Sequence, residues 1–251
     1  MRIVVVGGTG LIGAALVKKL VGGGHVAVAA SRATGVDVIT GEGLTDALEG
    51  ADVVVDTLNP NSVDPDETLR FFRHSGRVLL DGIRGAGVKH HVVLSALGAD
   101  RLSLSGFFLA KLLQENLVRA SGTPYTIIRS APFFETVYGI ATDADNGSEI
   151  RLPPIIVQPI AADDVALALA EVAVSPPANS VLEVAGPEVF RLTDLALEVL
   201  TAYEDVRRIL PDVQAPYFGA EVGPEKLVPE NPWWLATARF DDWLRNCLAT
   251  A

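Results

Sequence analysis

The chain has 251 residues, of which 49% are hydrophobic and 20% are charged, so it carries enough apolar material for a sizeable folded core. Its formal net charge of −11 opposes binding to nucleic-acid phosphates, and its single cysteine, Cys247, excludes an intrachain disulfide and a multi-cysteine metal site. No apolar run approaches the roughly 20 residues that span a bilayer, and the N-terminal apolar stretch is too short for a signal peptide. We therefore expect a cytoplasmic monomer or homodimer that acts on a small molecule, without a nucleic-acid or membrane partner.

Strand and helix patterns alternate through the first two thirds of the chain. Residues 3–6 form a continuous β-branched run, typical of a strand buried on both faces, and residues 11–20 follow with helical spacing. Further strands are predicted at 26–30, 53–56, 91–95 and 125–129, with a weaker one at 36–39. Helices are predicted at 44–48, at 107–121, and from a cap at Asp64 or Asp66 to about residue 86. This alternation predicts an α/β fold, a Rossmann-type doubly wound parallel sheet.

After residue 129 the pattern is looser. Short strands are predicted at 157–160 and 180–184, helices at 165–174, 191–200 and 240–248, and a loop at 143–147. Asp163 or Asp164 is expected to start the helix at 165–174. Residues 211–232 are rich in proline and are expected to be irregular.

A glycine-rich loop follows the first predicted strand. Residues 8–13, read as Gly8-Thr9-Gly10-Leu11-Ile12-Gly13, fit the pattern G-x-G-x-x-G, and Gly7 precedes them. The early glycines let the backbone turn and approach a pyrophosphate, while Gly13 lets helix and strand pack closely. The helix N-terminus then offers unpaired N–H groups and a positive dipole end to the phosphates. The position between a buried strand and a helix therefore indicates a dinucleotide site, with a ligand-free glycine turn as the alternative.

The residues after the second predicted strand distinguish between the two nicotinamide dinucleotides. NAD sites usually carry an acidic residue there, whereas this chain has Ser31-Arg32. An arginine can pair bidentately with a 2′-phosphate, so the sequence favours NADP(H), with NAD(H) possible. The alternative is a surface arginine at the end of a strand.

Six segments carry a resemblance to a known family, and they are spread over nearly the whole length of the chain. They are GGTGLIG at 7–13, GVKHHVVLS at 87–95, AKLLQE at 110–115, PYTIIR at 124–129, QPIAADDVA at 158–166 and VAGPE at 184–188. Through them the chain resembles the atypical short-chain dehydrogenase/reductases, specifically the NmrA-like NAD(P)-binding oxidoreductases. The resemblance implies a single domain over 1–251, with strand order 3-2-1-4-5-6. It also implies a small C-terminal substrate lobe, built mainly from about 130–158 and 186–251, and a nicotinamide near Pro132 and Phe133.

The catalytic positions follow from the same resemblance. Reductases of the wider superfamily use Tyr-x-x-x-Lys on one helix, which places both side chains on one face, together with an upstream Ser or Thr. Lys111 matches the lysine, which in those reductases also holds the nicotinamide ribose, and Ser95 matches the upstream hydroxyl, but Phe107 occupies the tyrosine position. Phenylalanine cannot transfer a proton. Lys111 is therefore expected to act as acid or base alone, or Tyr138 to supply a phenol, unless the protein only binds its cofactor.

Each of these positions also has a structural interpretation. In this interpretation Lys111 is a surface lysine paired with Glu115 at i+4, Ser95 is a strand-end serine with a local bond, and Tyr138 is a half-buried lobe residue. His90 and His91 lack a matching ligand cluster, so no metal site is predicted.

Taken together, the residues and the resemblance predict an NADP(H)-dependent reductase of a small carbonyl, enone or quinone-like substrate. Two alternatives stay open: a non-catalytic NADP(H)-binding redox sensor that acts through a partner protein, and a non-redox isomerase or dehydratase that keeps the cofactor.

Overall fold

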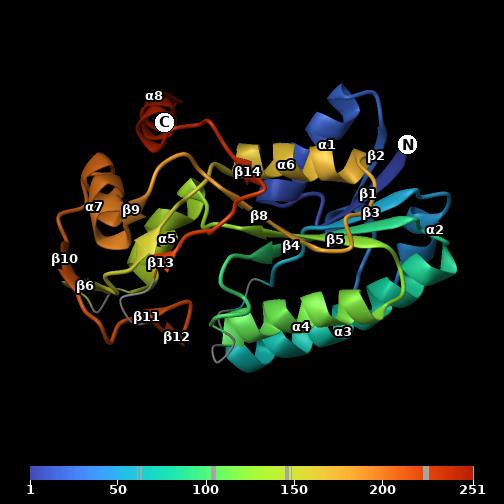
Figure 1. The fold of residues 1–251 in the computed structure, drawn as a ribbon, viewed down its shortest axis with the longest axis horizontal. Coiled ribbons are helices and arrows are strands. Elements are labelled where there is room, and N and C mark those ends of the chain that lie inside the picture. Colours follow the sequence, from blue (N-terminus) through green and yellow to red (C-terminus); the bar gives the residue numbers. More distant parts are fainter. Residues whose placement is uncertain are drawn as a thin grey trace.

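A parallel β-sheet forms the centre of the protein, and helices cover both of its faces (Figure 1). The computed structural model describes residues 1–60, 62, 64–102, 106–144, 147, 149–222 and 226–250. In spatial order the strands are β2 (Val26–Ala30), β1 (Arg2–Val6), β3 (Val53–Asp56), β4 (His90–Ala96), β5 (Tyr125–Ser130), β8 (Val181–Ala185) and β14 (Trp234–Leu235). All neighbouring strands are parallel, so their carboxyl ends meet at one edge. This confirms the predicted doubly wound α/β fold.

Four long helices form the two outer layers. The helices α1 (Leu11–Gly22) and α6 (Ala162–Val174) cover one face, and α3 (Pro65–Gly85) and α4 (Gly106–Ala120) cover the other (Figure 1). The short helix α2 (Leu44–Leu48) lies near the β2 end of the sheet. Successive β1 residues point to opposite faces, so Ile3 and Val5 pack with α1 and α6, while Val4 and Val6 join the core beneath α3.

The predicted ends of α3 are confirmed. Asp64 is the N-cap, and its carboxylate accepts a hydrogen bond from the Glu67 backbone N–H at 2.8 Å. The helix ends before Gly87, whose φ of +66° lies in the left-handed region that favours glycine.

A second core lies at one end of the molecule, to the left in Figure 1. Its elements are η2 (Phe134–Thr136), α5 (Val137–Asp143), β6 (Glu149–Leu152), β7 (Ile156–Val157), β9 (Phe190–Arg191), α7 (Leu192–Ala202), β10 (Arg208–Pro211), β11 (Pro216–Tyr217), β12 (Ala220–Glu221), β13 (Lys226–Leu227) and α8 (Phe240–Thr250). Apolar side chains such as Phe134, Leu195 and Phe240 fill it. The segment 211–232 thus contains two-residue strands, and part of the loop predicted at 143–147 lies outside the described residues.

The strand predicted at 36–39 is wrong. Ile39 donates its backbone N–H to the Asp37 carboxylate at 2.7 Å, and Gly41 donates to the Asp37 carbonyl at 2.8 Å. These local bonds close a turn, so the segment offers no ladder to β2. Val36 and Val38 are nevertheless buried, which explains the strand-like pattern. The strand order of the sheet therefore matches the implied order 3-2-1-4-5-6, except that strand 3, predicted at 36–39, does not form.

The expected cap of α6 is also wrong. The N-cap residue is Ala161, and neither Asp163 nor Asp164 caps the helix. Glu135, from the segment after β5, accepts a hydrogen bond from the Ala162 N–H at 3.0 Å, while Asp163 pairs with Lys19 at 2.7 Å. Glu135, which is 27 residues away in the sequence, therefore accepts a hydrogen bond at the start of α6 that a local aspartate was expected to accept.

No helix among the described residues is both long and apolar enough to cross a membrane.

Candidate functional site

The glycine loop turns sharply between β1 and α1. Gly7 has a φ of +79°, and the Gly10 N–H donates to the Gly7 carbonyl at 2.9 Å. A Cβ atom at Gly13 would lie 2.2 Å from the Gly7 carbonyl oxygen, which no real side chain tolerates. The close packing of loop and helix therefore requires glycine at 13, as the motif predicts.

The N-terminus of α1 has room for an anion. Gly10 is its N-cap, no side chain caps the helix, and its first turn carries no acidic residue. The first N–H groups of a helix have no partner within the helix, and the dipole end adds positive potential. These features fit the pyrophosphate of a dinucleotide, and the residues that would hold it are Thr9, Gly10, Leu11, Ile12 and Gly13.

A cavity of about 1080 Å³ runs from this loop along the carboxyl ends of the parallel strands. The cofactor-binding residues predicted from the sequence all line it: Gly7, Thr9, Gly10, Leu11, Ile12, Gly13, Ser31, Arg32, Lys111, Pro132 and Phe133. Ser95 and Phe107 line it too. One cavity thus brings together segments from five parts of the chain, at the sheet edge where ligands of such folds bind.

Arg32 lies at the wall of the cavity beyond β2, at the first position of η1 (Arg32–Thr34). Its side chain is exposed and forms no hydrogen bond or ion pair with the residues that the structure describes. The turn is held independently, because the Ser31 N–H donates to the Thr34 hydroxyl at 2.9 Å and that hydroxyl donates to the Ala29 carbonyl at 2.9 Å. Arg32 is thus a cation available to a ligand.

Lys111 is buried, with 5% of its surface exposed, so it is not the surface lysine of the alternative interpretation. Its Nζ atom lies 3.2 Å from the Leu58 carbonyl, 3.3 Å from the Leu94 carbonyl, and 4.5 Å from the centre of the Phe72 ring. Burial lowers the pKa of Lys111 to about 8, although the nearby carboxylate of Asp56 opposes this shift.

A buried amide links the lysine to that carboxylate. Gln114 donates to the Asp56 carboxylate at 2.8 Å, and its own carbonyl oxygen is 3.5 Å from Lys111 Nζ. Burial raises the pKa of Asp56, against the backbone hydrogen bond from Leu58 and the charge of Lys111. The cavity floor therefore holds an ammonium group whose pKa lies well below the usual value for lysine.

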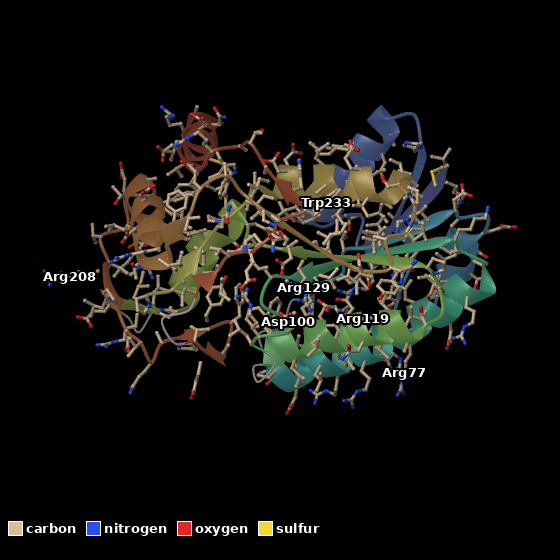
Figure 2. The ribbon with its side chains drawn as sticks, in the orientation of Figure 1. Arg77, Asp100, Arg119, Arg129, Arg208 and Trp233 are labelled. Carbon is tan, nitrogen blue, oxygen red and sulfur yellow. The ribbon has the colours of Figure 1, made fainter. Side chains whose placement is uncertain are left out.

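The Ser95 hydroxyl is directed to another partner. It donates to the Glu115 carboxylate at 2.7 Å, and Glu115 is fully buried. Arg129 donates two hydrogen bonds to the same carboxylate, at 2.9 and 2.8 Å, and pairs with Asp100 at 2.6 Å. Figure 2 shows Arg129 and Asp100 between the sheet and α4. With its proton committed to Glu115, Ser95 cannot donate to a substrate unless this network rearranges.

Aromatic rings form the wall of the cavity beyond Lys111. Phe107 stacks on Phe218 with ring centres 5.0 Å apart, and Phe108 lies edge-on to Phe107 at 5.1 Å. Tyr217 ends β11, and Phe218, with a φ of +49°, lies in the turn before β12. Phe107 thus faces the cavity in the position that usually holds the phenol, with no hydroxyl to offer.

Tyr138 does not line the cavity. Its ring packs against Tyr203 at 5.1 Å, and 38% of its surface is exposed. This placement does not support the suggestion that Tyr138 supplies a phenol. The adjacent residues Phe133 and Phe134 lie in different surroundings. Phe133 lines the cavity, while Phe134 is buried in the second core against Phe240.

His90 and His91 are buried residues of strand β4. The His90 ring bonds the Thr126 hydroxyl at 2.9 Å, and burial lowers the pKa values of His90 and His91 to about 4 and about 3. Among the described residues no group of His, Cys, Asp or Glu side chains could hold a metal ion.

Several cavity residues were missed by the sequence analysis. Thr57, Leu58 and Asn59 follow β3, and the rule that ligands bind at the carboxyl ends of parallel strands could have found them. Asp37 lines the cavity near Arg32, but its carboxylate accepts from the Ile39 N–H. No sequence signal marked Phe218.

The fold and the glycine loop define a dinucleotide-binding protein with a Rossmann-type sheet. A family model described as NAD(P)H-binding matches residues 7–176, and the chain belongs to this family. The predicted membership, with its nicotinamide cofactor, is therefore confirmed.

Curated relatives and solved structures were also compared with this chain. The photosystem II assembly factor Ycf39 of Synechocystis is 29% identical over 154 residues, covering 55% of this chain and 47% of that protein. The chain thus spans about half the length of the curated relatives it matches. Among solved structures, the dTDP-glucose 4,6-dehydratase DesIV of Streptomyces venezuelae has a TM-score of 0.71 at 16% identity, covering 99% of this chain and 96% of that chain. The UDP-glucose 4-epimerase of Thermus thermophilus has a TM-score of 0.69 at 16% identity, covering 91% and 90%. These structures share the fold.

Proposed function

We propose that the protein is an NADP(H)-dependent reductase of a small carbonyl, enone or quinone-like substrate. One observation carries this proposal: the glycine loop, the free Arg32, the buried Lys111 and an aromatic wall line a single cavity of about 1080 Å³. A bound nicotinamide supplies hydride chemistry, and the remaining space suits a small second molecule.

Arg32 supports the choice of NADP(H). Its guanidinium is exposed at the cavity wall and unpaired among the described residues, so it can form charge-assisted hydrogen bonds with a 2′-phosphate at no internal cost. The Ser31 hydroxyl lies beside it as a further donor. Asp37, the nearby acid, uses its carboxylate to cap the Ile39 N–H.

Lys111 is proposed as the proton donor. With Phe107 lacking a hydroxyl and Ser95 bonded to Glu115, the Lys111 ammonium is the titratable donor that faces the cavity beside the aromatic wall. A pKa of about 8 leaves it largely protonated at neutral pH, yet able to release a proton. As the proton donor, the Lys111 ammonium would exchange its hydrogen bonds to the Leu58 and Leu94 carbonyls for one to the substrate oxygen.

The aromatic wall supports a flat, apolar substrate. Phe107, Phe108, Tyr217 and Phe218 present ring faces and edges, and such groups stack on conjugated carbonyl compounds. Part of this wall comes from the C-terminal half of the chain, so the lobe built from about 130–158 and 186–251 is proposed to select the substrate.

Stopped-flow oxidation of NADPH by a panel of quinones and enones tests this function. Saturable turnover is expected with at least one of them, and Lys111→Met should abolish it. Lys18→Met, an exposed lysine on α1, is the matched control and should retain it. Equal activity in both variants would remove Lys111 from the mechanism.

A second candidate function is a non-catalytic NADP(H)-binding regulator. Two of the three usual proton-transfer positions, Phe107 and Ser95, are unable to donate in this arrangement. The curated relatives are named as assembly factors. Tight NADPH binding without turnover on any member of the panel would favour this candidate, or a dehydratase or isomerase that retains the cofactor, over the reductase.

A further inference from the structure

A second hollow adjoins the cavity on its outer side, along α3. Its volume is about 540 Å³, and four basic side chains line it: Arg70, Arg73, His74 and Arg77. The arginines recur at i, i+3 and i+7, so they share one face of the helix over about 10 Å. Figure 2 shows Arg77 on the side of α3 that faces away from the sheet. A concentrated positive face is unexpected on a chain with a net charge of −11.

These arginines have no charged partner among the described residues. Arg70, Arg73 and Arg77 form no ion pair or hydrogen bond with any part of the chain that the structure describes. Asp81, one helical turn beyond Arg77, pairs instead with Arg84 at 2.5 Å. The three guanidinium groups therefore repel one another, and a bound anion would reduce this repulsion.

The wall of the hollow is held in place. His74 bonds the Ile39 carbonyl through its Nε2 atom at 3.0 Å, which ties α3 to the turn at 37–41. Glu67, the carboxylate in the lining, accepts a hydrogen bond from the Ser62 hydroxyl at 2.6 Å. Ile39, Glu67 and Phe71 line the large cavity as well, so the two spaces share a wall.

We propose that the arginine face of α3 binds a small molecule that carries two or more phosphate groups, beside the cavity and distinct from it. Arginine presents a planar fork of donors that matches phosphate oxygens, and three forks in a row suit an oligophosphate better than a single anion. The volume lies within the range of small-molecule sites. Because the spaces share a wall, such a ligand would change affinity for whatever occupies the large cavity, and the effect would be reciprocal.

This site is formed by α3 and Ile39, and it does not depend on the proposed reductase activity. Inorganic triphosphate is the probe, titrated by calorimetry into the whole chain at low salt. One equivalent should bind, and the double variant Arg73→Gln/Arg77→Gln should bind at least about ten-fold more weakly. Arg84→Gln is the matched control, since it removes a charge from the same helix outside the hollow. Arg32→Ala and Gly10→Val, which change the phosphate-binding parts of the large cavity only, should also leave triphosphate binding unchanged.

Four results would overturn the proposal. Equal affinity in the double variant would remove the arginines from the site. Equal weakening by Arg84→Gln would reduce the effect to net charge, and loss of binding in Arg32→Ala would place the triphosphate in the large cavity. A hexaglutamate peptide that binds where triphosphate does not would replace the small-molecule site with a docking surface for an acidic protein segment. The substituted side chains are exposed, so circular dichroism and thermal unfolding should match the unmodified protein.

Discussion

Replacing Arg32 with alanine tests the choice of dinucleotide. The variant should bind NADPH more weakly and leave NADH almost unaffected, because only NADPH carries a 2′-phosphate. The Arg32 side chain is exposed at the cavity wall, and the η1 turn is held by Ser31 and Thr34 without it. The substitution therefore removes a ligand contact and no bond among the described residues.

The size of the effect follows from the exposure of Arg32. A hydrogen bond to a charged group contributes about 1.5–3 kcal/mol, which corresponds to roughly 10- to 150-fold in Kd. Solvent screening at an exposed site favours the lower end, so we expect about a ten-fold loss for NADPH. The loss in affinity should shrink as ionic strength rises, since salt screens the attraction between exposed charges and the Debye length is already only about 10 Å at 0.1 M.

Calorimetric titration of both dinucleotides measures this difference directly. Arg84→Ala is the control, because Arg84 is exposed, lies far from the glycine loop in sequence, and pairs with Asp81. Equal losses for NADPH and NADH, or no loss for either, would refute the assignment of Arg32 to the phosphate. In that case Arg32 would be the surface arginine that the sequence also allowed.

Three further changes probe the same cavity. Gly10→Val should abolish NADPH binding but preserve the fold, since a Cβ at Gly10 meets only the Gly7 carbonyl at 3.3 Å; full affinity by calorimetry would place the cofactor elsewhere. Phe107→Tyr adds a hydroxyl at the cavity wall and, because Lys111 already donates the proton, should change steady-state reduction of a ketone or aldehyde little; a rise of roughly 10²–10⁴-fold would mean that the protein lacks an effective proton donor without the phenol. Because Lys111 acts in its protonated form, kcat/KM should be level below a pH of about 8 and fall above it. A pH profile without this decline would exclude Lys111 as the proton donor.

Local pattern was sufficient to predict the strand, glycine turn and helix at the start of the chain. The strand, the glycine turn and the helix of residues 2–22 are adjacent in sequence, and each depends on short-range rules: β-branched burial, the absence of a Cβ, and helical period. Arg32 could likewise be placed at the cavity, because the end of the second strand always reaches the same edge of a parallel sheet.

Local pattern failed where a distant or polar partner decided the outcome. Residues 36–39 have an apolar pattern like a strand, but the Asp37 carboxylate closes a turn and leaves no ladder to the sheet. Asp163 is of a residue type that favours helix N-caps, yet the carboxylate of Glu135, from another segment, accepts the hydrogen bond at the start of α6. In both places a specific hydrogen bond outweighed propensity.

The sequence by itself determined that the chain is a parallel α/β protein, with a dinucleotide loop at its start and a lysine without its usual tyrosine. These features depend on residue type and spacing within one or two elements. Only the tertiary structure decided the state of the reacting groups. It joined the Ser95 hydroxyl to Glu115, buried Lys111 against two strand-end carbonyls, and stacked Phe218 on Phe107. Such contacts join segments far apart in the chain, so their geometry is set by how the layers pack, which residue spacing alone does not encode.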